Sequence, residues 1–351
     1  MNKLTCSTLA IFLTSSVALA SDGEWNSLEH EVNALSSTLN AAHDGPTVFG
    51  RVRTYYTSQA EGYTNPDTLA VSDMGGWSLA NMRLGAKGQV GPYDYKLQAE
   101  FKSGTAALLD AYASFGIGET MVGTFGQFKA GVARASRISS GRLLFRHRNM
   151  VGDAFSGRTG GLMLGTEMSQ MGLEISAMNG LDSVADEILL AYRISATIMG
   201  SGPGKVEGAY GGTEDPTLSG SMAFVDDGIS GDATVFELNS GTDLWSFDVA
   251  MCTAGDFGSG SSLGESIDAN SSPMSIQGSY MLQPGKWELA VRFQDFDKNL
   301  GGGGTENTTR TDVAINNYIN GHALKWMVNV QSDTEGANDN SEVTLGLQAS
   351  F

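Results

Sequence analysis

Apolar and polar residues alternate over long stretches of this chain, and the alternation is clearest at its end. In residues 342–351 every second side chain is apolar, and the intervening ones are polar or small. The apolar face comprises Val343, Leu345, Leu347, Ala349 and Phe351, and the other face Thr344, Gly346, Gln348 and Ser350. Residues 92–103, 286–294 and 323–331 follow the same period of two, which is typical of a β-strand with one apolar face.

The pattern predicts about sixteen strands, and we expect them to close into one all-β, antiparallel transmembrane β-barrel. A water-soluble β-sandwich alternates in the same way. The barrel is favoured because the strands are roughly ten residues long, aromatic residues stand at strand ends, and short connections alternate with long ones. The pattern is weakest between 200 and 240. The expected strands cover 46–56, 77–89, 92–103, 106–116, 119–129, 160–169, 171–179, 186–199, 219–227, 232–240, 242–253, 273–283, 286–297, 311–320, 323–332 and 342–351.

Two segments precede the expected barrel domain, 46–351. Residues 1–20 read as a secretory signal peptide, because Lys3 precedes an apolar stretch that ends in the small-residue motif Ala18-Leu19-Ala20. In residues 21–45 apolar side chains recur at spacings of three and four, which is the seam of a short coiled coil. We expect a periplasmic helix that associates between subunits, or else a lone amphipathic helix on the barrel. The seam consists of Trp25, Leu28, Val32, Leu35 and Leu39.

Composition narrows the class of protein. Glycine occurs 46 times and proline 7 times in 351 residues, which suits many tight turns and close contacts at a pore wall. The formal net charge of −18 argues against nucleic acid as a partner. Without the signal peptide the chain keeps one cysteine, Cys252, and so forms no internal disulfide.

Residues that could carry enzymatic chemistry are sparse. Two of the four histidines, His30 and His43, belong to the helical segment, and no metal cluster suggests itself. No nucleophile and base stand out as a pair. We therefore expect no enzymatic activity, no cofactor and no metal.

Basic residues recur on the polar faces of the expected strands. If the apolar faces meet lipid, these residues line the pore, and rings of basic side chains select anions in pores. The alternative is that they only solvate a polar lumen and pair with nearby acids such as Asp94 and Glu100. The pore-lining candidates are Arg51, Arg53, Arg83, Lys87, Lys96, Lys102, Arg292 and Lys325.

The strongest functional signal is the segment 130–158, between two expected strands. It holds six of the twelve arginines together with Leu143, Leu144 and Phe145, so it is too long for an ordinary connection and too apolar for a disordered one. We expect it to fold inward and to narrow the channel, where guanidinium groups would bind phosphate or carboxylate. Acids are frequent beyond residue 180 and leave the ion preference open. The constriction candidates are Lys129, Arg134, Arg137, Arg142, Arg146, Arg148 and Arg158.

Three groups of motifs resemble the phosphate-selective porins O and P of Gram-negative outer membranes. The resemblance spans most of 46–351, although each motif is short. The motifs are Arg83-Leu84-Gly85-Ala86-Lys87-Gly88 with Tyr95-Lys96-Leu97 and Glu100; Ala111-Tyr112 with Gly126-Gln127-Phe128-Lys129; and Lys286-Trp287-Glu288-Leu289-Ala290-Val291-Arg292-Phe293 with Asn316-Asn317-Tyr318-Ile319-Asn320-Gly321-His322 and Leu324-Lys325.

The resemblance implies a homotrimeric sixteen-stranded barrel whose pore is narrowed by an inward loop and passes phosphate or other anions along basic side chains. Lys129 and the arginines of 134–158 follow the matching motif. The acid-rich second half departs from the strongly basic lumen of that family.

Together these observations predict a porin of the bacterial outer membrane. It would pass small solutes by passive diffusion and would favour small anions. Two alternatives remain: a general or carbohydrate-permeable porin, in which Tyr112, Phe125, Phe128 and Phe145 would offer stacking surfaces, and a structural or adhesive barrel that tethers the envelope. The expected partners are outer-membrane lipids, two further copies of the chain, and the barrel-assembly machinery, which would read the last strand with Phe351.

Overall fold

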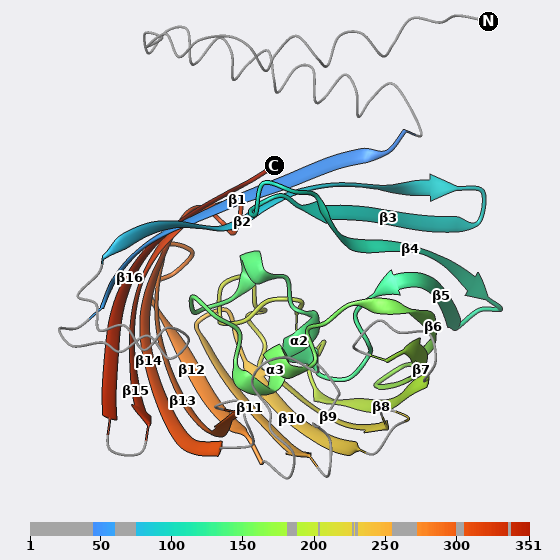
Figure 1. Ribbon diagram of the computed structural model, residues 1–351. Coiled ribbons are helices and arrows are strands. Elements are labelled where there is room, and N and C mark those ends of the chain that lie inside the picture. Colours follow the sequence, from blue (N-terminus) through green and yellow to red (C-terminus); the bar gives the residue numbers. More distant parts are fainter. Residues whose placement is uncertain are drawn as a thin grey trace, which may run out of the picture. The chain divides into compact units, whose positions relative to one another are not determined.

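In the computed structural model, hydrogen bonds between consecutive strands close the sixteen expected strands into an antiparallel barrel (Figure 1). The pairing of β1 with β16, from Arg51 opposite Ser350 to Gln59 opposite Glu342, completes the ring. The structure describes residues 45–59, 75–180, 188–202, 204–226, 228, 231–254, 272–299, 305–335 and 338–351. The signal peptide and nearly all of the helical segment 21–45 lie outside these residues.

The strands run close to their expected bounds. They are β1 Thr47–Gln59, β2 Gly76–Val90, β3 Tyr93–Glu100, β4 Ala107–Ile117, β5 Met121–Phe128, β6 Thr159–Met168, β7 Met171–Asn179, β8 Ile188–Met199, β9 Thr217–Asp226, β10 Asp232–Gly241, β11 Trp245–Ala254, β12 Met274–Gln283, β13 Trp287–Asn299, β14 Thr305–Asn320, β15 Leu324–Glu335 and β16 Asn338–Ser350.

The two faces of each strand meet different surroundings. On β16, Val343 and Leu347 are 47% and 52% exposed, whereas Thr344 and Gln348 on the other face are buried inside the barrel. A soluble sandwich would bury the apolar face instead. The outward apolar belt is therefore the surface of a transmembrane barrel, in which ring closure leaves no unpaired strand edge in lipid.

Aromatic side chains flank this belt at both ends of the strands. Tyr93 and Trp245 each begin a strand after a short turn and are exposed. Trp77 is the second residue of β2 and lies at the opposite end, where its ring is 5.3 Å from that of Tyr56. Amphipathic rings of this kind are typical of the two interfaces of a membrane barrel.

Two strands start earlier than their patterns predict. β14 begins at Thr305 rather than 311, and β16 at Asn338 rather than 342. The residues 305–310 are all polar or charged, so they show no alternation, but their backbone still pairs with β13 as far as Thr305 opposite Asn299. Backbone pairing therefore continues past the stretch in which one face is apolar.

The weak pattern between 200 and 240 also has a physical cause. On β9, Met222 and Phe224 face outward and are exposed, while Ala223 and Val225 face inward and are buried. Both faces are apolar because the inner one packs against a segment inside the barrel. This removes the contrast between faces on which a period of two depends.

Connections at one end of the barrel contain two or three residues, with one exception. The short ones are 91–92, 118–120, 169–170, 242–244, 284–286 and 321–323. The exception is 200–216 between β8 and β9, which we call the turn-side segment. The structure describes all of it except residue 203.

Gly126 supports the pairing of β4 with β5, where it lies opposite Tyr112. Its φ is +120°, and a Cβ there would lie 2.3 Å from the carbonyl oxygen of Ala111. Gly126→Ala should lower the free energy of unfolding by about 1–3 kcal/mol, because both the backbone and the contact become strained. Urea titration of the barrel in lipid vesicles, followed by tryptophan fluorescence, measures this. Gly116→Ala on β4 is the control, since a Cβ there meets nothing within 4 Å, and an equal loss in both variants would contradict the prediction.

Candidate functional site

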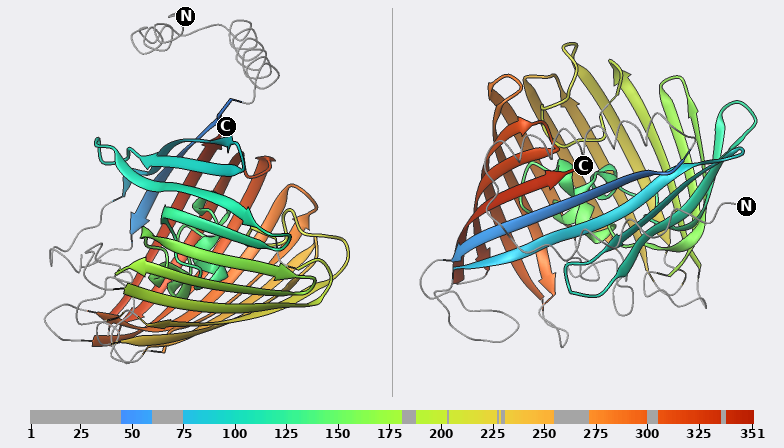
Figure 2. Two further views of the ribbon diagram at one scale, coloured as in Figure 1. Left: turned by 90° about the vertical axis from the view of Figure 1, so that its right-hand side faces the viewer. Right: turned by 90° about the horizontal axis from the view of Figure 1, so that it is seen from above.

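Residues 129–158, which we call the constriction segment, lie inside the ring of strands (Figures 1 and 2). The segment contains the helix α2 Arg134–Arg137, the 3-10 turn η1 Ser140–Arg142 and the helix α3 Met150–Ala154. Asn149 caps α3 by accepting a hydrogen bond from the amide of Gly152.

Apolar contacts hold the constriction segment against the inner wall. Val151 and Phe155 belong to a buried cluster that includes Leu189, Val225 and Val235 on β8, β9 and β10. This explains why the inner faces of these strands carry aliphatic side chains at positions that would otherwise meet water.

A second apolar contact lies on the opposite flank of the segment. Leu144 and Phe145 pack with Ala290 of β13 and Ala314 of β14, and all four are buried. The hydrophobic residues that distinguished 130–158 in the sequence thus fix the segment to two parts of the wall.

Arginines of β1 bind the backbone and hydroxyl groups around η1. Arg51 donates to the hydroxyls of Ser139 and Ser140 at 2.8 and 2.7 Å. Arg53 donates to the carbonyl oxygens of Ser140 and Arg146 at 2.6 and 3.2 Å. These two guanidinium groups therefore lie at the contact between the wall and the constriction segment.

Long polar side chains of β13–β16 donate hydrogen bonds to other carbonyl oxygens of the constriction segment. Lys325 donates to Leu143 at 2.7 Å, and Arg292 donates to His147 at 3.0 Å. Both side chains are buried. The two predicted lining residues thus position the segment and do not face open water.

Acids of the wall complete the attachment. Glu237 of β10 accepts hydrogen bonds from the backbone amides of Arg134 and Ala135 at 2.5 and 2.9 Å. The ion pair between Arg146 and Glu342 joins the segment to β16. The acid-rich second half of the chain therefore supplies partners for the arginines.

Two groups of charges lie on the β2–β8 side of the lumen. Asp110 is shared by Lys96 at 2.6 Å and Arg158 at 2.5 Å. A further shared acid is Glu174, which pairs with Arg137 at 2.5 Å and Arg193 at 3.2 Å. Each group combines two cations with one anion, so each keeps a net positive charge.

The remaining candidates have other surroundings. Arg83 pairs with Glu100 at 2.7 Å. Lys87 is exposed near the end of β2. Lys102 lies in an exposed turn beyond β3 rather than on an inner strand face, because pairing with β4 ends at Glu100. Arg142 is exposed on the constriction segment, within 3.5 Å of the carbonyl oxygen of Lys205.

Two basic residues bind within the constriction segment itself. Lys129 donates to the carbonyl oxygen of Ser136 at 2.5 Å, and Arg148 donates to those of Ala135 and Ile138. Burial, and then the nearby arginines, lower the pKa of Lys129 well below its ordinary value. The hydrogen bonds of Lys129 and Arg148 therefore stabilise the fold of the constriction segment.

Among the described residues, several cations lie beyond ion-pair distance of every carboxylate. Among the predicted site residues they are Arg51, Arg53, Lys87, Lys102, Lys129, Arg142, Arg148 and Lys325. Arg51 and Arg53 thus place two positive charges, which no ion pair cancels, where β1 meets the constriction segment, although the whole chain is acidic.

The aromatic side chains proposed for carbohydrate stacking do not converge. Phe125 is exposed on the outer face, whereas Phe128 and Phe145 are buried in apolar clusters. Tyr112 packs against the first of these clusters. The geometry does not favour a stacking path for sugars.

Sequence reasoning missed the turn-side segment as part of this site. Glu207 of that segment is buried and accepts a hydrogen bond from the amide of Leu144 at 3.0 Å. Burial raises the pKa of its carboxyl. The high glycine content of 200–212 could have indicated a long connection here. The stretch falls instead within the weakly patterned region 200–240.

No family model and no curated protein matches the chain, but solved structures do. The outer membrane channel DcaP of Acinetobacter baumannii is 13% identical with a TM-score of 0.60, over 87% of this chain and 97% of that one. The anion-selective porin from Comamonas acidovorans is 12% identical with a TM-score of 0.61, over 88% and 99%. Salmonella typhi OmpF in complex with daunomycin is 9% identical with a TM-score of 0.62, over 88% and 98%.

At these identities the likeness shows the fold, and the chain has the barrel fold of outer-membrane porins. The resemblance to the phosphate-selective porins O and P stays a prediction.

Proposed function

We propose that this protein is a diffusion channel of the bacterial outer membrane whose constriction favours small anions such as phosphate. The observation that carries the proposal is the excess of positive charge where the constriction segment meets β1. Arg51 and Arg53 bind neutral oxygen atoms there, so their charges are not cancelled locally. Fixed cations in a narrow aqueous pore raise the local concentration of anions and lower that of cations.

The belt of exposed apolar side chains supports the membrane location, and the porin fold supports a channel. We extend the proposal to a homotrimer, the assembly implied by the resemblance noted above. One of the similar structures, from Comamonas acidovorans, is that of an anion-selective porin, which is consistent with the charge distribution here.

The function is tested by inserting the purified full chain into planar lipid bilayers. We expect stepwise increases of current in KCl, and a partial block of that chloride current when inorganic phosphate is added. Glucose at the same concentration is the control and should leave the current nearly unchanged. Block by glucose but not by phosphate would favour the carbohydrate channel, and an absence of current steps would reject the channel.

A further inference from the structure

The turn-side segment is an anomaly in the architecture of the barrel. Every other described connection at its end has two or three residues, whereas this one spans 200–216. Transmembrane barrels keep their connections short at one end. Seventeen residues far exceed what is needed to join two neighbouring antiparallel strands.

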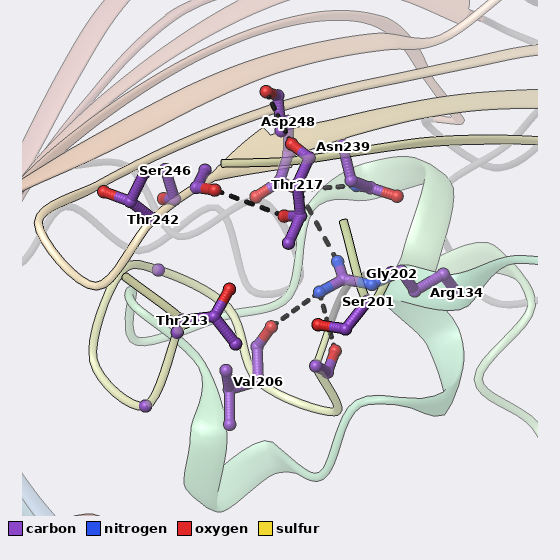
Figure 3. A pocket seen from close by; sticks show the side chains of 16 residues that line it. Arg134, Ser201, Gly202, Val206, Thr213, Thr217, Asn239, Thr242, Ser246 and Asp248 are labelled. Carbon is purple, nitrogen blue, oxygen red and sulfur yellow. Dashed lines mark hydrogen bonds and ion pairs between the residues drawn. The ribbon is translucent and has the colours of Figure 1, made fainter. Parts of the chain in front are cut away.

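The turn-side segment enters the barrel from the end with the short turns and contacts the constriction segment. The amide of Glu207 donates to the carbonyl oxygen of Arg142 at 3.0 Å, and the Glu207 carboxylate accepts from the amide of Leu144. Arg134 donates to the carbonyl oxygens of Gly204 and Val206 at 2.9 and 2.7 Å (Figure 3). The two segments therefore bind each other through hydrogen bonds of the Glu207 amide, the Glu207 carboxylate and the Arg134 guanidinium.

The same segment is fixed to the wall on its other side. Glu288 of β13 accepts from the amide of Ala209 at 2.6 Å, from Ser279 at 2.6 Å and from the hydroxyl of Tyr318 at 2.5 Å. The ring of Tyr210 stacks on that of Tyr318 with centroids 4.0 Å apart. Each contact lies inside the barrel on inward-facing side chains of β12–β14.

Close packing at Gly208 shows how tightly the two segments fit. Its φ is +85°, and a Cβ there would lie 2.5 Å from a methyl carbon of Leu144 and 2.5 Å from a carboxylate oxygen of Glu288. A side chain at this position would strain the backbone and push aside Leu144 and Glu288, which both contact the turn-side segment.

What remains between the turn-side segment and the wall is a cavity of about 230 Å³ (Figure 3). It is lined by Arg134, by Thr213 and other residues of the turn-side segment, and by wall residues such as Asn239 and Asp248. Asp248 is already bound by Asn239 at 2.5 Å and lies 3.5 Å from a terminal nitrogen of Arg134. The polar groups on this side are therefore engaged with one another.

Exposure of charged side chains differs between the two sides of the lumen. On the β2–β8 side the side chains of Arg137 and Lys96 are 37% and 29% exposed. Glu207 of the turn-side segment and Glu288, which binds that segment, are at most 1% exposed. The carboxylates at the contact between the turn-side segment and β13 are therefore covered, whereas Arg137 and Lys96 are open to the lumen.

We propose that the turn-side segment is a second constriction element, which fills the lumen between the constriction segment and the β9–β14 wall and confines solutes to the β2–β8 side. This inference rests on the proposed function and adds a determinant of the size limit of the channel. The two segments enter from opposite ends and meet at Arg142–Leu144, so the narrow region depends on both.

The test compares the full chain with a variant in which Asn-Gly replaces 200–216 and closes β8 and β9 as a two-residue turn. The single-channel conductance in KCl should rise at least about two-fold, because current in a water-filled pore follows its open cross-section. Vesicle swelling should also show faster uptake of a trisaccharide relative to glucose. Equal conductance and equal swelling in the two proteins would overturn the inference and leave the proposed function standing, whereas an absence of current from the full chain would overturn both.

A point variant keeps the test decisive if the shortened chain does not fold. Gly208→Ala should raise the conductance or the frequency of current fluctuations, because the added Cβ displaces the segment from Leu144. Gly91→Ala is the matched control, since Gly91 also has a positive φ but lies in a short turn where a Cβ meets nothing within 4 Å. The same behaviour in both glycine variants would count against the second constriction.

Discussion

Replacing Arg51 and Arg53 together by glutamine is expected to abolish most of the anion preference of the channel. Glutamine keeps a hydrogen-bond donor for Ser139 and Ser140 but removes two positive charges from the contact between β1 and the constriction segment. A unit charge in water acts on an ion a few ångströms away with about 1 kcal/mol or less, so each substitution should change the chloride-to-potassium permeability ratio by about three-fold. Salt screens the effect, which should therefore be largest at low ionic strength.

Zero-current potentials of the double variant and the parent chain in a KCl gradient measure this change. Lys286→Gln is the control, because Lys286 is an exposed cation in the short turn 284–286, at the end of the barrel opposite the one at which the constriction segment joins β5 and β6. A double variant with the permeability ratio of the parent would show that Arg51 and Arg53 do not set the selectivity.

The largest loss of stability is expected from Arg292→Ala. The Arg292 guanidinium pairs with Asp312 at 2.8 Å, donates to His147 and lies 4.3 Å from the centre of the Phe145 ring. Both charged side chains are buried. Removing the cation leaves a buried carboxylate without its ion-pair partner, which costs about 3–5 kcal/mol of unfolding free energy.

The matched control removes both charges. In Arg292→Met combined with Asp312→Leu no buried charge remains unpaired, so a large part of the loss should be recovered. Urea titration of the parent, the single variant and the double variant in lipid vesicles gives the three free energies. A single variant within about 1 kcal/mol of the parent, or a double variant less stable than the single one, would contradict this role for the pair.

Most of the fold could be predicted because each face of a barrel wall has a constant environment, so outward residues are apolar and inward residues are polar. Val343 and Thr344 on β16 show it plainly, since lipid on one side and polar groups on the other impose a strict period of two. The rule fails on β9 and β10, where the constriction segment supplies an apolar partner inside the barrel. There Val225 and Val235 are buried inward next to outward residues that are also apolar.

The site was less predictable for a different reason. Sequence indicates which residues are basic but not which oxygen atoms they will meet. Arg292 and Lys325 occupy inward positions, as their strand faces indicated, yet they are buried against backbone carbonyls of the constriction segment. Lys102 follows the same alternation in sequence but lies in a turn, because β3 ends two residues earlier.

The division of the arginines into positioning and free charges follows from their partners. Arg146 and Arg158 each pair with an acid of the wall, Glu342 and Asp110, and so fix the middle and the last residue of the constriction segment. Arg51 and Arg53 instead meet hydroxyl and carbonyl oxygens. These neutral acceptors bind the guanidinium groups but leave their positive charge, and this surplus is the basis for the proposed selectivity.

The most direct test of the anion-favouring constriction is the zero-current potential of the full chain in a bilayer between concentrated and dilute KCl. Excess positive charge at the constriction predicts faster passage of chloride, so the dilute side should become negative relative to the concentrated side. A positive potential on the dilute side would mean that potassium passes faster, and it would contradict the proposed selectivity.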